Sequence, residues 1–321
     1  MVTTLKRGVE AAEAFVEQQD EEVLLGSPTA LWKTALRRLF RRKTGVVGLC
    51  LVGMMMITAL AAPLLAPYDP QEVLIGKEPV RKREAPCIHL LGCEADKPQH
   101  IMGIDGNFRD QLSRVIYGAR VSLSIGFTTV LFAVSGGMIL GAIAAYWGGW
   151  LDNVIMRIMD VILGFPSLLL AIAIVAVLGP GIRNALLAIA IVTLPAYARV
   201  MRASVLSIKE LDFVAASKAI GASRTRILLV RIVPNAITPI VVLATLGIAS
   251  AILDAAGLSF LGLGAQPPTA EWGTMLGSER NQVFSAPHLV FFPGLAIMIT
   301  VLGFNLLGDG MRDALDPRLN D

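Results

Sequence analysis

The sequence predicts an all-α, polytopic membrane protein with six transmembrane helices, and three observations support this fold class. The 321-residue chain is 55% hydrophobic and only 17% charged, whereas soluble domains carry about 25% charged residues. Its mean hydropathy is +0.65. Apolar runs recur along the chain at lengths near the roughly 20 residues that a helix needs to cross the hydrocarbon core. The net charge of +3 is not gathered in a basic patch with interleaved aromatics, which argues against nucleic-acid binding.

The six predicted spans are residues 45–67, 121–147, 161–179, 184–198, 235–253 and 283–308. The fourth is short, but Arg183 and Arg199 stand at its ends and lengthen it by reaching toward the headgroups. Pro166 and Pro195 predict kinks in the third and fourth spans, because neighbouring helices can satisfy the freed backbone groups.

These spans divide the chain into segments. The polar tail 1–44 is too charged, and the apolar run after it too long, for a cleavable signal peptide. The first span (45–67) is followed by an extracytoplasmic insert at 68–118, a five-span core at 119–309 and a tail at 310–321. Within the core, residues 199–234 form a cytoplasmic loop.

Lysine and arginine near the span ends predict the orientation, since they are in excess on the cytoplasmic side. One group precedes the first span and another fills the loop 199–234: Lys33, Arg37, Arg38, Arg41, Arg42 and Lys43; then Arg199, Arg202, Lys209, Lys218, Arg224, Arg226 and Arg231. With six spans, both groups lie on one side, so both termini are predicted to be cytoplasmic.

Three further segments carry structural predictions. Residues 108–120 form an amphipathic helix at the membrane interface, with one apolar face made by Leu112, Val115, Ile116 and Ala119. Gly137 and Gly141 have the small-xxx-small spacing of closely packed membrane helices, although glycine is also an ordinary filler of such helices. The glycine- and proline-rich loop 254–285 faces outside and dips back toward the bundle.

The insert contains two of the three cysteines. A disulfide between Cys87 and Cys93 is the main interpretation, because an extracytoplasmic loop lies in an oxidising setting. A zinc site with His89 and His100, or unpaired thiols, are the alternatives. Cys50, inside the first span, is expected to be a small apolar filler.

The stretch 212–234 interrupts the apolar pattern and predicts a compact helical hairpin. Its first helix carries Phe213, Ala216, Ser217 and Ile220 on one face and stops at Gly221, a residue suited to the left-handed position after a helix. Ser223 is placed to cap the basic helix that follows. Such a hairpin is either a docking surface for a partner or a pair of amphipathic helices resting on lipid.

This stretch resembles the "EAA" loop of ABC-importer membrane subunits. The matching positions are Ala216, Gly221 and Val233-Pro234, while the departures are Ala215 in place of Glu, Ser217 in place of Ala and Val233 in place of Leu. The missing carboxylate at Ala215 weakens the expectation of an acidic contact to a partner and leaves helix docking intact.

The resemblance extends from about residue 37 to the end of the chain. Motifs at 100–110, 112–120, 146–152, 156–160, 178–184 and 257–264, with Pro267-Pro268 and Trp272-Gly273, resemble those of C-type permease subunits of dipeptide and oligopeptide importers. Ile104, Phe108 and Glu271 depart from that pattern. The resemblance implies a MetI-like core of the type I ABC importer class with an added N-terminal span.

The resemblance also implies a heteromeric importer of small peptides in the cell membrane. The expected partners are a second, homologous permease subunit, two cytoplasmic ATP-binding subunits, an extracytoplasmic peptide-binding protein and membrane lipid. ATP and Mg²⁺ would be bound by the ATPases, and this chain would hold no cofactor, no metal and no catalytic site. The residues expected to couple it to an ATPase are Asp212, Phe213, Ala215, Ala216, Ser217, Ile220, Gly221, Arg224 and Arg226.

Other functions remain open at this point. The same architecture serves other solutes, such as a nickel chelate, glutathione or a sugar, and a scaffold without transport is a further alternative. An ion-coupled secondary carrier is disfavoured because such carriers use intramembrane charges, and Asp160 and Asp254 are expected only at span ends. Residues 26–34 resemble a P-loop superficially, but no glycine precedes Lys33. Substrate and pore-lining residues are not specified by the sequence.

Overall fold

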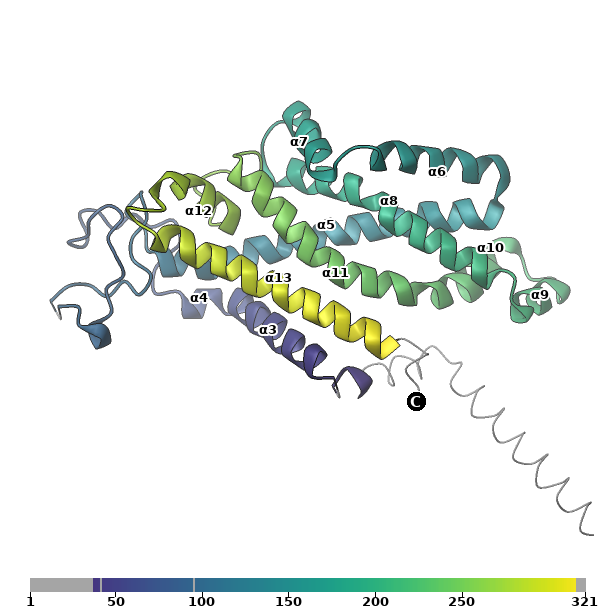
Figure 1. Cartoon of the computed structure of the whole chain (residues 1–321), viewed down its shortest axis with the longest axis horizontal. Helices are drawn as coiled ribbons and strands as arrows, with labels where there is room; N and C mark the ends of the chain where they lie inside the picture. Colours follow the sequence, from purple (N-terminus) through teal and green to yellow (C-terminus); the bar gives the residue numbers. More distant parts are fainter. Residues whose placement is uncertain (1–36, 41, 95, 316–321) are drawn as a thin grey trace, which may run out of the picture.

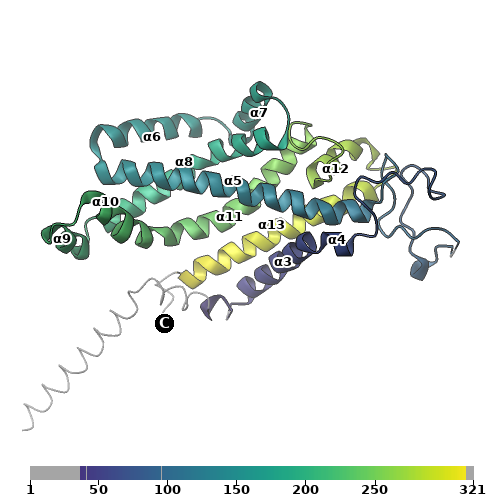
Figure 2. The same cartoon turned by 180° about the vertical axis from the view of Figure 1, so that it is seen from behind.

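The computed structural model describes residues 37–40, 42–94 and 96–315, and the predicted N-terminal tail up to residue 36 and the P-loop-like segment lie outside them. The described part is a bundle of helices with a folded insert at one end (Figures 1 and 2). The main helices are α3 (Lys43–Leu60), α4 (Ala62–Leu65), α5 (Gln111–Trp147), α6 (Gly149–Leu163), α7 (Ser167–Leu178), α8 (Ile182–Ile208), α9 (Asp212–Ala219), α10 (Arg224–Arg226), η2 (Ile227–Ile232), α11 (Val233–Phe260), α12 (Trp272–Glu279) and α13 (His288–Leu315).

Five of these segments are long and apolar enough to cross a membrane, and the bent pair α6–α7 makes a sixth candidate if it is counted as one span. The helical membrane fold is therefore confirmed, and the six predicted spans correspond to these six candidates. The third span is not a kinked helix, however: α6 and α7 meet at 93°. Pro166 has no N–H and disfavours a helical residue before it, so the chain leaves the helix between Gly164 and Pro166. Pro195, by contrast, lies inside the continuous α8.

Several predicted boundaries move. The insert ends where α5 begins at Gln111, α13 continues to Leu315 rather than ending before residue 310, and α8 extends through Ile208 into the predicted loop. On the other side of that loop, the helical run from Arg224 passes through Pro234 without interruption to Phe260. A proline in the first turn of α11 is tolerated there. The predicted 199–234 loop is thus mostly helix.

The first turns of α5 also differ from the prediction. The apolar residues Leu112, Val115 and Ile116 are only partly buried, whereas Gln111, Ser113 and Arg114 are almost fully buried. The buried polar groups have partners in the insert, in α13 or at Pro268 in the loop before α12; for example, Arg114 donates to the carbonyl of Pro70 at 2.8 Å. These turns are therefore part of one transmembrane helix covered by the insert, and not a separate interfacial helix.

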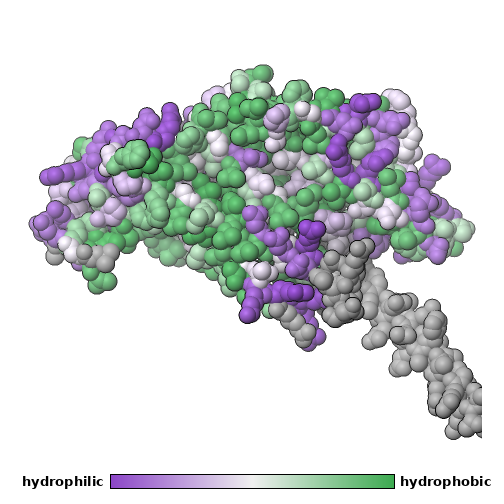
Figure 3. Space-filling view, viewed as in Figure 1, coloured by the Kyte–Doolittle hydropathy of each residue, from purple (hydrophilic) through white to green (hydrophobic). Residues whose placement is uncertain are grey.

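Helices α5, α8 and α11 form the centre, and α3 lies beside α13 along one side (Figures 1 and 2). A Cβ at Gly137 would lie 2.9 Å from the backbone nitrogen of Ala198, and one at Gly141 would meet the Ala198 carbonyl oxygen. The predicted small-residue contact is thus confirmed: it brings the backbones of α5 and α8 together. A broad apolar band covers the middle of the molecule between polar ends (Figure 3).

Helix α6 buries little of its surface; Met159 is its one buried residue. It is joined to α8 by two ion pairs. Arg202 donates to both oxygens of Asp152 at 2.6 Å, and Arg199 donates to Asp160 at 2.6 Å. The two arginines were expected in a cytoplasmic loop, but they lie in α8 and hold α6 against it.

The 254–285 segment is mostly helical. Helix α11 continues to Phe260, so Asp254 lies inside the helix and not at its end. Helix α12 packs against α11, and a Cβ at Gly273 would lie within 2.9 Å of the Ala256 backbone. The buried Glu271 caps α12, accepting hydrogen bonds from the backbone nitrogens of Gly273 and Thr274 at 3.0 and 2.8 Å. The expectation that this segment returns toward the bundle is confirmed.

Polar contacts hold the insert on one end of the bundle. Glu279, at the end of α12, accepts from Arg83 at 2.8 Å and from the backbone nitrogen of Gly106 at 3.0 Å. Asp105 pairs with Arg109 at 2.8 Å and with Arg114 of α5 at 3.4 Å. The insert is consequently tied to α5 and α12 rather than being an independent loop.

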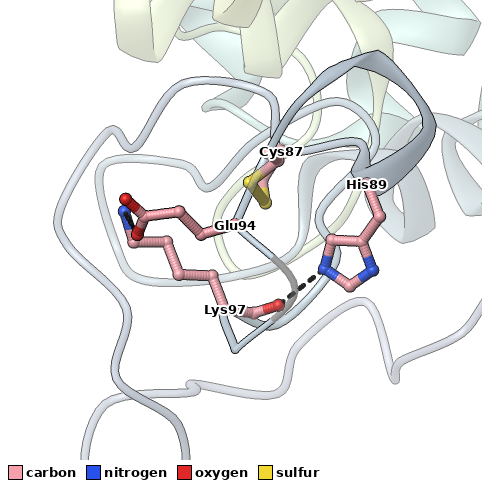
Figure 4. Close-up of a disulfide and its surroundings, with 5 residues drawn as sticks. Cys87, His89, Glu94 and Lys97 are labelled. Carbon is pink, nitrogen blue, oxygen red and sulfur yellow. Dashed lines mark hydrogen bonds and ion pairs between the residues drawn. A yellow bond between two sulfur atoms is a disulfide. The ribbon is translucent and has the colours of Figure 1, made fainter.

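Cys87 and Cys93 form a disulfide in the insert (Figure 4). His89 points to the carbonyl oxygen of Lys97 at 2.8 Å, and Lys97 pairs with Glu94 at 2.8 Å. His100, the other ligand of the alternative zinc site, lies between Asp110 and Glu78. Cys87 and Cys93 are thus bonded to each other, while His89 and His100 contact different groups, so the four residues do not share a zinc site in this structure. Cys50 is a free thiol exposed on α3.

The buried His100 gives the insert a predicted pH dependence. Its Nδ1 lies 2.9 Å from Asp110 and its Nε2 lies 3.2 Å from Glu78, and Tyr68, which donates to Glu78 at 3.1 Å, packs on its ring. Burial lowers the pKa of His100, but its hydrogen bond to Asp110, the charge of Asp110 and the charge of Glu78 raise the pKa above its usual value overall. The imidazolium's contribution is therefore complete below about pH 6.5 and is lost as the pH rises through the folded-state value.

We expect amide hydrogen exchange in residues 68–110, corrected for intrinsic rates, to show at least about fivefold more frequent opening at pH 8.5 than at pH 5.5. The His100→Gln protein, which keeps hydrogen bonding without a charge, should lose this difference. An equal pH response in both proteins would assign it to another group.

Candidate functional site

The hairpin between α8 and α11 lies at the end of the molecule opposite the insert (Figure 1). Helix α9 is eight residues long and is joined to α8 by the short turn at Lys209–Leu211. After α9 the chain turns at residues 220–223 and enters α10, η2 and α11 in one continuous helical run. Both connections are short, so α9 is held close to α8 and to the α10–α11 run.

Local chemistry sets the ends of α9. Asp212 lies in its first turn and Lys218 in its last, which matches the helix dipole. Gly221 follows in the left-handed region at φ +80, and its N–H donates to the Lys218 carbonyl at 3.0 Å. Ser223 caps α10 by accepting from the backbone nitrogen of Arg226 at 3.4 Å. The predicted roles of Gly221 and Ser223 in the turn are both confirmed.

One face of α9 anchors it to the bundle. Val214 is fully buried and belongs to an apolar cluster with Met201 and Val205 of α8 and Ile227 and Ile232 of η2. Ser217 is also buried, and its hydroxyl donates to the Phe213 carbonyl at 2.8 Å. Ser217 therefore faces the bundle and does not share the free face that the spacing predicted. Val214 was missed; the signal for it was its three-residue spacing from Ser217, which places both residues on the same, buried face of α9.

The opposite face of α9 is open. Phe213 is 39% exposed and Ile220 is 83% exposed, and between them Ala215 and Ala216 are exposed with little side chain. Asp212 is also exposed, as are Arg224 and Arg226 beyond the turn. Large apolar residues thus flank a small-residue centre, a shape that allows close seating in a cleft. Except for Ser217, the predicted contact residues lie on accessible surface.

Comparison with known proteins identifies the type of molecule to which this hairpin belongs. Residues 137–321 match the family model of binding-protein-dependent transport system inner membrane components, which covers more than half of the chain. Residues 30–84 match the model of the N-terminal transmembrane domain of oligopeptide transport permease C. The chain belongs to this permease family.

Curated relatives of this permease cover nearly its whole length. It is 47% identical over 288 residues to a dipeptide transport system permease protein of Alkalihalophilus pseudofirmus, covering 90% of each chain. It is 44% identical to a di/tripeptide permease of Pseudomonas aeruginosa, with 92% and 96% covered. A glutathione transport system permease of Pectobacterium atrosepticum is 42% identical, with 90% and 91% covered.

Among solved structures, the permease resembles a chain of an inward-facing methionine ABC transporter with a TM-score of 0.52. The match has 18% sequence identity and covers 63% of this permease and 96% of that chain, so it supports the fold. The MetI-like fold class is thus confirmed. The molecule is a multi-pass membrane permease, a non-enzymatic subunit of an ABC importer whose ATP hydrolysis belongs to separate subunits.

Family membership also decides against the ion-coupled carrier. The argument from the sequence was that Asp160 and Asp254 lie only at span ends. It was partly wrong, because Asp254 lies inside α11. Asp160 lies in the last turn of α6, just before the break between α6 and α7, and pairs with Arg199 of α8 at 2.6 Å.

Proposed function

We propose that this permease forms one half of the pore of an ATP-driven importer of small peptides. A second, homologous permease completes the pore, two ATPases bind ATP and Mg²⁺ on the cytoplasmic side, and an extracytoplasmic protein delivers the peptide. The peptide cargo is supported by the relatives named for dipeptides and tripeptides. The relative named for glutathione, itself a tripeptide, is consistent with the same substrate class.

The observation that carries the coupling role is the two-sided construction of α9. Its inner face is fixed to α8 and η2 through Val214, while its outer face offers Phe213, Ala216 and Ile220 to a partner. A helix that rests on lipid would also expose apolar residues, but it would have no need of an anchor that ties it to two membrane helices. In the proposed mechanism the ATPases move as they close on ATP, and α9 carries that movement to α8 and α11.

The proposed orientation places the hairpin and both termini in the cytoplasm and the insert outside. The hairpin end carries Lys209, Lys218, Arg224, Arg226 and Arg231, consistent with the positive-inside rule. The disulfide at the opposite end is consistent with an oxidising compartment.

Cross-linking tests the docking role of α9. In a Cys50→Ser background, Ala216→Cys should form a disulfide cross-link to a cysteine in the cleft of the partner ATPase. Leu64→Cys is the matched control, because Leu64 is 89% exposed in the short helix α4, far from α9 (Figure 1). Cross-linking at both positions, or at neither in an assembled transporter, would contradict the proposal.

The cargo is tested separately by uptake in cells that depend on this transporter. We expect unlabelled dipeptides and tripeptides to compete at least about tenfold better than free amino acids, because a buried site discriminates strongly against a partner lacking its hydrogen-bonding groups. Competition only by a sugar or a nickel chelate would replace the peptide assignment and leave the docking role of α9 untouched.

A further inference from the structure

We propose that the permease holds an anionic phospholipid beside α9, with the headgroup in a basic cavity and an acyl chain in an adjoining apolar groove. The inference goes beyond the proposed function and uses only its orientation, with the hairpin at the cytoplasmic leaflet. It arises from two neighbouring hollows between the ends of α5 and α8 and the start of the α10–α11 run.

The first hollow, the basic cavity, has a volume of about 550 Å³. Its charged residues are Lys209 at the end of α8, Lys218 of α9, Arg224 of α10 and one acid, Glu210. The Lys209 ammonium also donates to the carbonyl of Ala145 at 3.4 Å. Three cations against one carboxylate leave the cavity positively charged, and basic pockets between membrane helices on the cytoplasmic side are suited to anionic headgroups.

Aromatic residues line the same cavity at the level expected for the membrane interface. Tyr146 and Trp147 end the long helix α5 and contact each other edge to face, with ring centroids 5.2 Å apart. Tyrosine and tryptophan are enriched at the headgroup level of membrane proteins. These two aromatic residues are consistent with a cavity that opens at the headgroup level.

The second hollow, the apolar groove, has a volume of about 300 Å³ and shares Trp147 with the basic cavity. It runs along α5 and the η2 segment, between residues such as Ile139, Ile143 and Leu229. Ile139 and Leu229 are each 59% exposed, so the groove is open on the lipid-facing side. An apolar channel that continues from a cationic cavity matches a molecule with a charged head and a hydrocarbon tail.

The basic cavity and the apolar groove together indicate which kind of molecule binds there. Free phosphate or a nucleotide would use the basic cavity and leave the groove empty, and a zwitterionic lipid would bring no net charge to the cations. An anionic glycerophospholipid satisfies both parts. Its headgroup would bridge Lys209, on a membrane helix, and Lys218, on α9, and so hold the hairpin in position from the side opposite its free face.

The assembled transporter is purified in detergent and exposed to mixed micelles of phosphatidylglycerol and phosphatidylcholine. Native mass spectrometry then measures which of the two lipids the protein retains. We expect preferential retention of phosphatidylglycerol. The Lys209→Gln/Lys218→Gln variant should lower that retention roughly tenfold. Ile139→Trp, which fills the groove from its exposed side, should also lower it.

Arg231→Gln is the matched control, since Arg231 is an exposed base of the same hairpin that lines a different hollow; its retention should equal that of the unmodified protein. Addition of inorganic phosphate, or of glycerophosphoglycerol without acyl chains, should not displace the lipid. The proposal is overturned if both lipids are retained equally, if the control loses as much as the double variant, or if inorganic phosphate competes fully. Retention is measured without transport, so its outcome is independent of the peptide and docking assignments.

Discussion

Replacing Gly221 with proline is expected to reduce ATP-coupled uptake by more than about tenfold. Gly221 holds φ at +80 and donates its N–H to the Lys218 carbonyl. Proline fixes φ near −65° and has no N–H, so the turn after α9 cannot close. Because residues 220–223 join α9 to the continuous α10–α11 run, the exposed face of α9 would be misdirected relative to the bundle.

The substitution at Gly221 can be graded. Asparagine tolerates the left-handed region and valine does not, and no atom lies within 4 Å of a Cβ placed there. We therefore expect Gly221→Asn to retain most uptake and Gly221→Val to lose most of it. Uptake of labelled peptide and co-purification of the ATPases are measured together. A proline variant that assembles and transports within about twofold of the unmodified protein would show that the geometry of α9 is not needed for coupling.

Replacing Gly141 with leucine is expected to have the largest effect on stability, about 3 kcal/mol. At this position a Cβ would meet the carbonyl oxygen of Ala198 and come within 3.0 Å of Met201. Both belong to α8, whose backbone is held close to α5 by Gly137 and Gly141. In lipid, helix association depends on such packing rather than on hydrophobic burial. If α5 and α8 are pushed apart, no gain in hydrophobic burial therefore offsets the lost contacts.

Gly53→Leu is the control, because Gly53 also lies in a transmembrane helix but has no atom within 4 Å of a Cβ. We expect it to change the free energy of unfolding by no more than about 0.5 kcal/mol. Unfolding in detergent, followed by circular dichroism, compares the two variants. Equal midpoints would mean that α5 and α8 adjust to separation, and that the close approach is not a source of stability.

The sequence was most informative where function requires a particular backbone or a run of motifs. Gly221 and Ser223 predicted the turn after α9 because a left-handed residue and a helix cap have strong local preferences. Gly137 and Gly141 predicted the contact of α5 with α8. The roles of the α9 residues in ATPase coupling remain predictions, as do the cytoplasmic termini.

The errors occurred where tertiary contacts override local pattern. Leu112, Val115, Ile116 and Ala119 predicted one apolar face of an interfacial helix, yet of these only Ala119 is buried, and the insert supplies polar partners that bury Ser113 and Arg114. Arg199 and Arg202 were assigned to a loop because they are charged, but acids on α6 neutralise them within α8. Several of these partners are distant in sequence: Pro70 precedes Arg114 by 44 residues, and Asp160 and Asp152 precede the two arginines by 39 and 50 residues.

By itself, the sequence determined that this chain is a helical membrane permease, how many apolar runs it has and where its hairpin turns. These properties follow from hydrophobic length and local backbone preference. Only the tertiary structure decided which helix faces are buried and that the third span breaks between α6 and α7. It also decided that Val214 anchors α9, whereas Phe213 and Ile220 stay exposed. The physical reason is that membrane helices are apolar on their lipid-facing and protein-facing sides alike, so hydrophobic periodicity does not reveal which side packs.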